Sequence, residues 1–378
     1  MAHYLDNAAT TPVRPEAAQA ALEAMTEGWG NPSARYELGT RAADQVKLWR
    51  ADVAAALGCL PEEVIFTSCG TESDNWAIQA AVQLGRHKGR HIITTAIEHS
   101  AVLNPCKELE RQGYEVTYLK PNKQGSIDMD DLRAALRPDT ILVSMMLVNN
   151  ELGTVLPVAE TAKAIKEAKC PALLHCDAVQ GFLKVPFTPA QLGVDMLSIS
   201  GHKIHAPKGI GAMYIRKGLK LPPLILGGGQ ENGLRSGTEP TAQIAALAMA
   251  AKLGRESLDR DLRHMEELKE YAVERLTAIP GLKVLIPDGA PHILPITLTG
   301  YKSEVVVRFL SDMGVYVSAG SACHRGKPSH VYAALKLPKK EQDGVLRVSF
   351  SYDTTREDVD ALVDGLSAAH DQLFTSLS

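Results

Sequence analysis

The sequence is poor in aromatic residues, has no excess of positive charge and contains no long apolar run. Of its 378 residues 5% are aromatic, and 40 Lys and Arg stand against 44 Asp and Glu, for a formal net charge of -4. A chain without a positive excess lacks the general electrostatic attraction that binds nucleic acid. No apolar run approaches the roughly 20 residues that cross a bilayer, and Met1 to Asp6 lack the charged and apolar regions of a signal peptide. We therefore expect a cytoplasmic protein with small polar partners and no contact with membranes or nucleic acid.

Cysteine is sparse as well, and its positions follow no metal-binding pattern. The six residues are Cys59, Cys69, Cys106, Cys170, Cys176 and Cys323. None of them has the CxxC or CxxH spacing of metal ligands. The spacing predicts neither a zinc site nor a disulfide framework, and no metal is expected.

Length and patterning predict an α/β protein with two domains. The chain is longer than one hydrophobic core usually fills. Between about residues 15 and 250, helical patterns alternate with short β-rich runs, which is typical of a mostly parallel sheet covered by helices. A charged helical run at 256–276 then precedes new strand-like segments, so a second domain is expected there.

The expected elements can be given by residue range. Strands are predicted at 64–67, 91–95, 114–119, 140–148, 172–176, 194–199, 211–215, 293–298 and 315–317. Helices are predicted at 75–84, 101–112, 158–168, 256–276 and 356–374. This alternation favours a doubly wound sheet in the first domain.

Residues that follow the predicted strands are the first place to expect chemistry, because open α/β sheets bind ligands beyond the carboxyl ends of their strands. After the strand at 64–67, residues 68–73 (Ser-Cys-Gly-Thr-Glu-Ser) open a helix with small polar side chains. Backbone amides at a helix N-terminus bind anions such as phosphate. An ordinary capping turn is the alternative interpretation.

Two further strands are followed by a carboxylate and an amine. Asp177 follows the strand at 172–176, and Lys203 ends the segment Ser-Gly-His-Lys after the strand at 194–199. A desolvated lysine has a lowered pKa and is available for Schiff-base formation. Taken singly, Asp177 would cap a turn and Lys203 would be a surface lysine. Together with an anion cradle they are what pyridoxal phosphate needs to act as an electron sink.

A loop of small residues in the expected second domain surrounds one cysteine. Cys323 is followed by His324, Arg325 and Lys327, whose positive potential favours the reactive thiolate. A buried structural cysteine is the alternative, but the glycines and charges around Cys323 argue against burial. The sequence therefore predicts a reactive thiol in a loop that can move.

The motifs together resemble the cysteine desulfurases, especially the nitrogenase-associated and iron–sulfur-cluster type. The resemblance covers nearly the whole chain and rests on residues 5–12 (LDNAATTP), 66–75, 98–99 (EH), 148–151 (VNNE), 177–180, 200–203, 235–238 (RSGT) and 321–323 (SAC). It implies a pyridoxal-phosphate enzyme of fold type I that forms a homodimer. It also implies a large domain of residues 13–252 and a small domain of residues 1–12 and 253–378 that carries the catalytic cysteine loop.

The resemblance further implies a role for each matching residue. Lys203 holds the cofactor covalently, Asp177 pairs with its pyridine nitrogen, and Gln180 reaches its ring hydroxyl. His99 stacks on the ring or acts as an acid or base in catalysis, whereas a helix-capping histidine is the alternative without the resemblance. The implied phosphate ligands are Gly70, Thr71, Ser200, His202 and, from the neighbouring subunit, Thr238.

The resemblance also implies that Asn150 and Arg347 bind the substrate carboxylate. This role suits the fork of hydrogen-bond donors of an arginine. Without the resemblance, Arg347 would be a charge on an edge strand. The implied reaction takes L-cysteine, whose Cα proton is removed by Lys203 and whose sulfur is received by Cys323 as a persulfide, leaving L-alanine. An acceptor protein, either a cluster scaffold or a tRNA-thiolation enzyme, then takes the sulfur. The loop after Cys323 is shorter and more basic than is usual in the family, and no long tail follows the last predicted helix, so the acceptor stays open.

Two other functions compete with this interpretation. A selenocysteine lyase or a small-amino-acid aminotransferase of the same fold needs the same Lys203 and Asp177, but an aminotransferase needs no mobile thiol. A non-catalytic subunit of this fold would bind a sulfur-transfer partner or store the cofactor. Intact Lys203, His99 and Cys323 argue against the non-catalytic reading.

Overall fold

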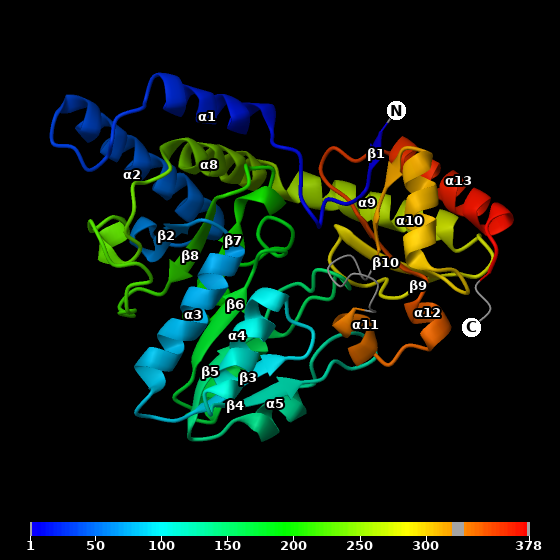
Figure 1. The fold of residues 1–378 in the computed structure, drawn as a ribbon, viewed down its shortest axis with the longest axis horizontal. Coiled ribbons are helices and arrows are strands. Elements are labelled where there is room, and N and C mark those ends of the chain that lie inside the picture. The colour runs from blue at the N-terminus through cyan, green and yellow to red at the C-terminus, as the bar shows by residue number, and fades with distance from the viewer. Residues whose placement is uncertain (1, 320–328, 376–378) are drawn as a thin grey trace.

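The computed structural model describes residues 2–319 and 329–375 of the chain. Its elements form two parts that lie side by side (Figure 1). One part is built around a seven-stranded sheet and the other around a four-stranded sheet. Helices α8 (Thr241–Glu256) and α9 (Leu258–Leu276) follow one another from the first part to the second. Within the described residues, no helix is both long enough and apolar enough to span a membrane.

The larger sheet is mostly parallel, which confirms the α/β class expected from the sequence. Its strand order is β2-β8-β7-β6-β5-β3-β4, and only β8 runs antiparallel to its neighbours. The strands are β2 (Val64–Thr67), β3 (His91–Thr95), β4 (Glu115–Leu119), β5 (Thr140–Ser144), β6 (Leu173–Asp177), β7 (Met196–Ser200) and β8 (Gly211–Ile215). Five of them, β2, β3, β5, β7 and β8, are buried along their whole length, as is typical of parallel strands covered on both faces.

Helices cover both faces of this sheet because successive side chains of each strand point to opposite sides. On β3, Ile92 packs with Trp76 and Val102 of one helical layer, whereas Ile93 packs in a separate cluster with Val53 and Leu247. The helices of this part are α1 (Pro15–Thr26), α2 (Glu37–Leu57), α3 (Gly70–Gly85), α4 (Ser100–Arg111), α5 (Met129–Ala135), α6 (Val158–Glu167), α7 (Pro189–Leu192) and α8.

The smaller part combines the C-terminal third of the chain with its N-terminal end. Its antiparallel sheet has the order β12-β13-β10-β9, and β1 pairs in parallel with β11 beside it. The elements are β1 (His3–Tyr4), α9, β9 (Leu282–Val284), β10 (Ile293–Leu298), α10 (Ser303–Asp312), β11 (Val315–Tyr316), β12 (Ser318–Ala319), α11 (His330–Ala334), α12 (Lys339–Gln342), β13 (Val345–Ser349) and α13 (Arg356–Gln372). Leu5 is fully buried in the same core cluster as Leu310 and Phe350. The N-terminal end therefore shares a core with the last third of the chain.

Several expected elements need correction. The strand expected at 140–148 ends at Ser144, because the next residues leave the sheet and Val148 makes only an isolated bridge to Val155. Strand β7 begins two residues later than expected and runs through Ser200. Arg347 does not lie on an edge strand, since β13 pairs with β10 on one side and β12 on the other. The short strands β9 and β12 were not predicted, because two or three residues carry no periodic pattern.

Candidate active site

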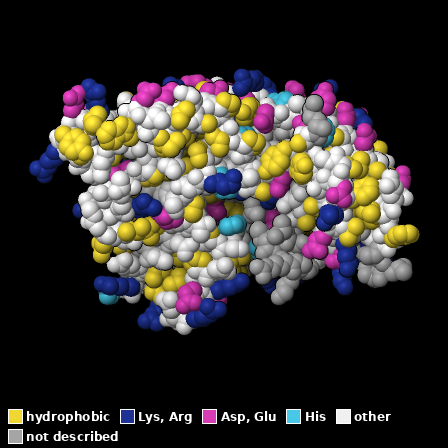
Figure 2. Space-filling view, turned by 45° about the horizontal axis from the view of Figure 1, so that its top comes forward, with side chains coloured by type: hydrophobic (Ala, Val, Ile, Leu, Met, Phe, Trp, Pro, Cys, Tyr) yellow, Lys and Arg dark blue, Asp and Glu magenta, His cyan; other side chains and the backbone are white. Residues whose placement is uncertain are grey.

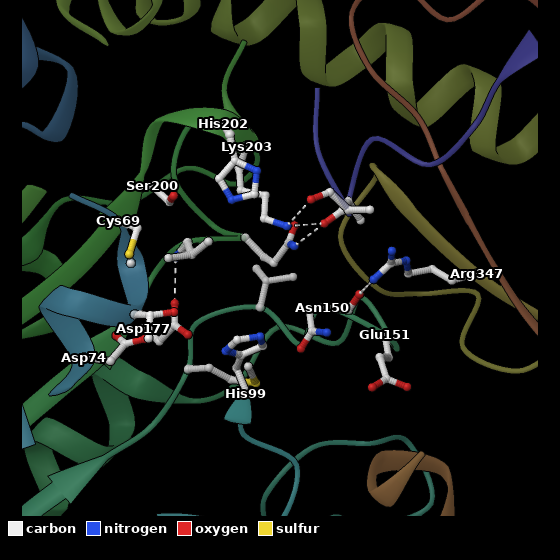
Figure 3. A pocket seen from close by; sticks show the side chains of 18 of the residues that line it. Cys69, Asp74, His99, Asn150, Glu151, Asp177, Ser200, His202, Lys203 and Arg347 are labelled. Carbon is white, nitrogen blue, oxygen red and sulfur yellow. Dashed lines mark hydrogen bonds between the residues drawn. The ribbon is translucent and has the colours of Figure 1, made fainter. Parts of the chain in front are cut away.

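A cavity of about 310 Å³ lies where the two sheets meet, beyond the carboxyl ends of β6 and β7. Figure 2 shows this face hollowed in its middle, with histidine and charged side chains in and around the hollow. Ten of the residues expected to form the site line the cavity: Gly70, Thr71, His99, Asn150, Asp177, Gln180, Ser200, His202, Lys203 and Arg347. Figure 3 shows Lys203 and His99 on opposite sides of it, with Asp177 toward one end and Arg347 toward the other. Residues far apart in the sequence are thus brought together at the expected edge of the sheet.

The start of α3 forms one end of the cavity and is built to receive an anion. The helix begins at Gly70, and the side chain of Cys69 before it makes no capping hydrogen bond. A Cβ atom on Gly70 would lie 2.6 Å from Cγ2 of Val179, so only glycine fits this close approach. The hydroxyl of Ser200 is buried nearby without a hydrogen-bond partner among the described residues. Unused donors at a helix N-terminus are suited to a phosphate group.

His202 adds a neutral donor to this end. Burial, and to a lesser degree the charges of Lys203 and Lys208, lower the pKa of His202 to about 4. Its Nδ1 atom lies 3.2 Å from Oγ1 of Thr10. A neutral imidazole keeps one N–H near pH 7, which can be donated to an anion.

Asp177 ends β6 as a buried carboxyl. Its side chain is 5% exposed and accepts a hydrogen bond of 2.9 Å from the amide of Val179. Burial, followed by the charge of Asp74, raises the pKa of Asp177 to about 7. A carboxyl in such a place becomes stably ionised when a cationic partner comes beside it.

His99 both caps a helix and lines the cavity. It is the N-cap residue of α4, and its Nδ1 atom accepts a hydrogen bond of 3.2 Å from the amide of Ala101. The helix-capping role that the sequence analysis gave as the alternative for His99 is therefore present, and His99 lines the cavity as well. Because Nδ1 is an acceptor and burial lowers the pKa of His99, the ring is neutral with its proton on Nε2.

Lys203 lies just after β7, in a short 3-10 turn (Gly201–Lys203). Its ammonium donates hydrogen bonds of 2.6 Å and 2.7 Å to the carbonyl oxygens of Ala8 and Ala9. The side-chain amide of Gln180 donates to the same carbonyl of Ala8, at 2.9 Å. The N-terminal segment thus contacts the residues expected to hold the cofactor, which the sequence analysis did not foresee.

Arg347 faces the cavity from the smaller sheet. One guanidinium nitrogen donates to the carbonyl oxygen of Asn150 at 2.9 Å, and another donates to Asp6 at 2.8 Å. The remaining nitrogen, Nε, is buried without a hydrogen-bond partner among the described residues. A fork of donors held in this way is suited to binding a carboxylate.

Comparison with known proteins identifies the family. The model of the aminotransferase class-V family matches residues 3–362. The cysteine desulfurase IscS of Methanosarcina thermophila is 43% identical over 368 residues, which is 96% of this chain and 90% of that protein. The chain belongs to the cysteine desulfurases of the class-V aminotransferase family. Members of this family depend on pyridoxal phosphate.

Solved structures agree with this family. A NifS-like protein superimposes with a TM-score of 0.94 at 36% identity, covering 99% of this chain and 100% of that one. SspA in complex with cysteine superimposes with a TM-score of 0.82 at 35% identity, covering 93% of this chain and 100% of that one. The fold is therefore that of the family's type I pyridoxal-phosphate enzymes.

Thr238, which the family resemblance places in the site, does not line this cavity. It lines a separate cavity of about 220 Å³, together with Ser68 and Arg235. Cys323, with His324, Arg325 and Lys327, lies outside the described residues.

Asp74 lines the cavity but was missed in the sequence. It is 1% exposed, and its Oδ1 atom, 3.5 Å from Nε2 of His175, has no hydrogen-bond partner among the described residues. Burial raises the pKa of Asp74 to about 7 and lowers that of His175 to about 4. Its spacing was the available signal, since a residue four positions after Gly70 lies on the same face of α3 as the helix start.

We predict that Asp74→Asn stabilises the cofactor-free protein at alkaline pH. The folded pKa of Asp74 is raised, so the folded protein binds this proton more tightly than the unfolded chain, and stability is lost as the pH rises through 7. An amide removes that loss and should raise the free energy of unfolding at pH 8 by roughly 1–3 kcal/mol relative to wild type. The gain should shrink toward pH 4.

The measurement is urea unfolding at pH 5 and pH 8. Asp131→Asn, an exposed substitution on α5, serves as the control and should leave the pH profile unchanged. Equal effects of Asp74→Asn on the free energy of unfolding at both pH values would show that the pKa of Asp74 is not raised in the folded protein.

Proposed function

We propose that this chain is a cysteine desulfurase that holds pyridoxal phosphate on Lys203 and transfers the sulfur of L-cysteine to Cys323. The observation that carries the proposal is one cavity that contains a lysine, a buried carboxyl, a helix N-terminus and an arginine fork. Each of these groups matches one part of the cofactor or of an amino acid. The family relatives support the same activity, and SspA was solved with cysteine.

The residues present fit the cofactor. The buried hydroxyl of Ser200 and the start of α3 offer donors for a phosphate, and Asp177 offers a carboxylate for a protonated ring nitrogen. Lys203 would hold the aldehyde carbon covalently, with Gly70, Thr71 and His202 as further phosphate ligands. His99 would stack on the ring and Gln180 would turn to its hydroxyl. Thr238 of a second copy would complete the phosphate site.

When bound, pyridoxal phosphate supplies an electron sink for the bond that breaks at Cα. The amine of Lys203 would take the proton from Cα of the bound amino acid. The carboxylate of Asp177 would be the counter-charge of a protonated ring nitrogen. Arg347 and Asn150 hold the substrate carboxylate, which orients Cα toward Lys203.

Cys323 is proposed as the sulfur acceptor. Its thiolate would form a bond to the substrate sulfur while the bond from that sulfur to Cβ breaks. The electron pair of the broken bond would stay with the carbon part, where the proton of the substrate thiol would be taken up at Cβ. Lys203 would return the proton to Cα, so that the carbon part leaves as L-alanine. The persulfide then passes its outer sulfur to an acceptor protein for cluster assembly or tRNA thiolation. Cys69 is the rival thiol, because it lines the cavity.

The proposed assembly is a cytoplasmic homodimer of two-domain subunits. Residues 13–252 would form the large domain, and residues 1–12 with 253–378 the small one, which is supported by the pairing of β1 with β11 and by buried Leu5. Exposed apolar side chains on α1 and just after it support an interface there, since Leu22, Met25 and Trp29 are 49%, 58% and 64% exposed.

Lys203→Ala should remove both the covalent linkage to the cofactor and turnover. No other amine lines the cavity within the described residues. The purified variant should lack a linkage to pyridoxal phosphate that borohydride can reduce, and its alanine production should fall by at least about a hundredfold. Lys208→Ala is the matched control, five residues along the chain. A reducible linkage that survives in Lys203→Ala but disappears in Lys208→Ala would contradict the assignment.

Cys323→Ala should stop sulfur transfer after the substrate has bound. The absorbance of the bound cofactor should still change when L-cysteine is added, because binding depends on Lys203 and Arg347. Alanine and sulfide production in the presence of a reductant should fall by at least about a hundredfold. Cys69→Ala should keep the activity. If Cys69→Ala is the inactive variant, the thiol at the start of α3 is the acceptor. Equal turnover of selenocysteine and cysteine by wild type would instead favour a lyase.

A further inference from the structure

Residues 224–238, between β8 and α8 in the chain, form a closed loop on the larger part of the molecule. The two arms of the loop are paired near its base, where the amide of Leu224 donates to the carbonyl of Leu234 at 2.8 Å. Two side chains of the loop reach the surface, since Leu226 is 84% exposed and Thr238 is exposed as well. The loop thus combines a fixed base with an exposed tip and an exposed end.

The middle of this loop holds a strained backbone. Glu231, Asn232 and Gly233 form a short 3-10 turn and have φ angles of 49°, 57° and 79°, in the left-handed region. Glycine adopts this region freely and asparagine tolerates it, but glutamate rarely does. Strain of this kind persists only where the surrounding structure imposes it, and it is frequent at ligand sites. Contacts of Glu231 must therefore hold the turn in place.

Arg50 on α2 supplies those contacts. Its two terminal nitrogens each donate a hydrogen bond of 2.7 Å to Glu231, one to each carboxylate oxygen. The amide of Phe66 on β2 donates to the same carboxylate at 2.9 Å, and Arg50 is itself held by the carbonyl of Val64 at 2.7 Å. The side chains of Arg50 and Glu231 are only 16% and 4% exposed. A bidentate pair fixes geometry as well as charge, so it anchors the turn to α2 and to the edge strand β2.

Gln230 connects this anchor to the end of the loop. It precedes Glu231, and its Oε1 atom accepts a hydrogen bond of 3.0 Å from the amide of Gly237. Gly237 has a φ angle of 128°, which residues with a Cβ rarely adopt, and it directly precedes Thr238. The position of Thr238 at the surface therefore depends on Gln230 and, through the backbone, on the pair of Glu231 with Arg50.

A second ion pair ties the same loop to the start of α3. Nε of Arg235 donates to Glu72 at 2.9 Å. Glu72 lies in the same helical turn as Gly70 and Thr71, which are proposed to bind the phosphate of their own subunit. Arg50 lies on a different helix, so it can be substituted without touching that turn.

We propose that Arg50 and Glu231 are positioning residues that hold Thr238 ready to bind the cofactor phosphate of a second copy of this chain. The inference rests on the proposed function, in which Thr238 completes the phosphate site of a neighbouring subunit. It adds that this contribution is prepared by a buried ion pair within the subunit that donates the threonine. A loop fixed in advance loses little conformational freedom when it binds, so its hydrogen bond contributes fully to affinity.

The test compares how the cofactor-free dimer binds pyridoxal phosphate and pyridoxal, which lacks the phosphate. Arg50→Met should raise the Kd for pyridoxal phosphate about tenfold, as expected for a lost hydrogen bond to a charged group. The Kd for pyridoxal should stay within about twofold, whereas a general loss of structure would weaken both ligands. Arg41→Met is the matched control on the same helix. Its ion pair with Glu37 is 73% and 76% exposed, so neither Kd should change.

A double-mutant cycle shows whether the effect passes through Thr238. Thr238→Val alone should raise the Kd for pyridoxal phosphate about tenfold, and adding Arg50→Met should raise it no further, because both substitutions remove the same interaction. Gln230→Met is a second route if Arg50→Met does not fold. It leaves the ion pair intact, removes only the contact with Gly237, and should give the same selective loss.

Equal losses for the two ligands in Arg50→Met, additive losses in the double variant, or unchanged binding by Gln230→Met would overturn the proposal. A shift of Arg50→Met to monomers in sedimentation, at the concentrations of the titration, would overturn it too, because the pair would then hold the subunits together rather than the loop. A different result refutes the proposed function itself: wild type that binds pyridoxal phosphate no more tightly than pyridoxal has no phosphate site for Thr238 to complete.

Discussion

The N-terminal segment, residues 5–14, is the connection on which the active site depends. It is anchored to the smaller sheet, where Asn7 donates to the carbonyl of Ser349 and the amide of Ser349 donates to Leu5. It is anchored to the larger part as well, through the amide of Thr11 on the carbonyl of His202. Between these anchors, the carbonyls of Ala8 and Ala9 receive the ammonium of Lys203. A few residues therefore set the distance between the two walls of the cavity.

Burial sets the chemistry of the groups placed between those walls. The pKa values of Asp74 and Asp177 are both raised to about 7, and that of His202 is lowered to about 4. In each case burial, which disfavours the charged form, is the largest cause. Between about pH 4 and pH 7 these three side chains are therefore mostly uncharged before a ligand arrives. A cationic ring nitrogen would then have the carboxylate of Asp177 as its counter-charge. An anionic group would accept hydrogen bonds from the amides at the start of α3.

The sequence predicted best those site residues that directly follow a strand of the larger sheet. Asp177 and Lys203 could be predicted because strand periodicity places them at a common edge of the sheet. The contacts of Ala8 and Ala9 could not, since backbone carbonyls leave no signal in the sequence and their partners lie about 195 residues away. Arg347 was misread as an edge residue because the strand that covers it, β12, is two residues long. Asp74 was overlooked since a carboxylate inside a helix usually faces solvent.

The pairing of β1 with β11 and of Asp6 with Ser349 has a consequence for how the chain is made. Residues 3–6 are partners of strands that are synthesised more than 300 residues later. At 5–20 residues per second, this is a delay of roughly 15 to 70 s. During that time the larger sheet can assemble, but the N-terminal segment that covers Lys203 still lacks its anchor on the smaller sheet. The catalytic chamber is thus completed only after the strand that ends at Ser349 has emerged, so a shorter nascent polypeptide presents an open platform.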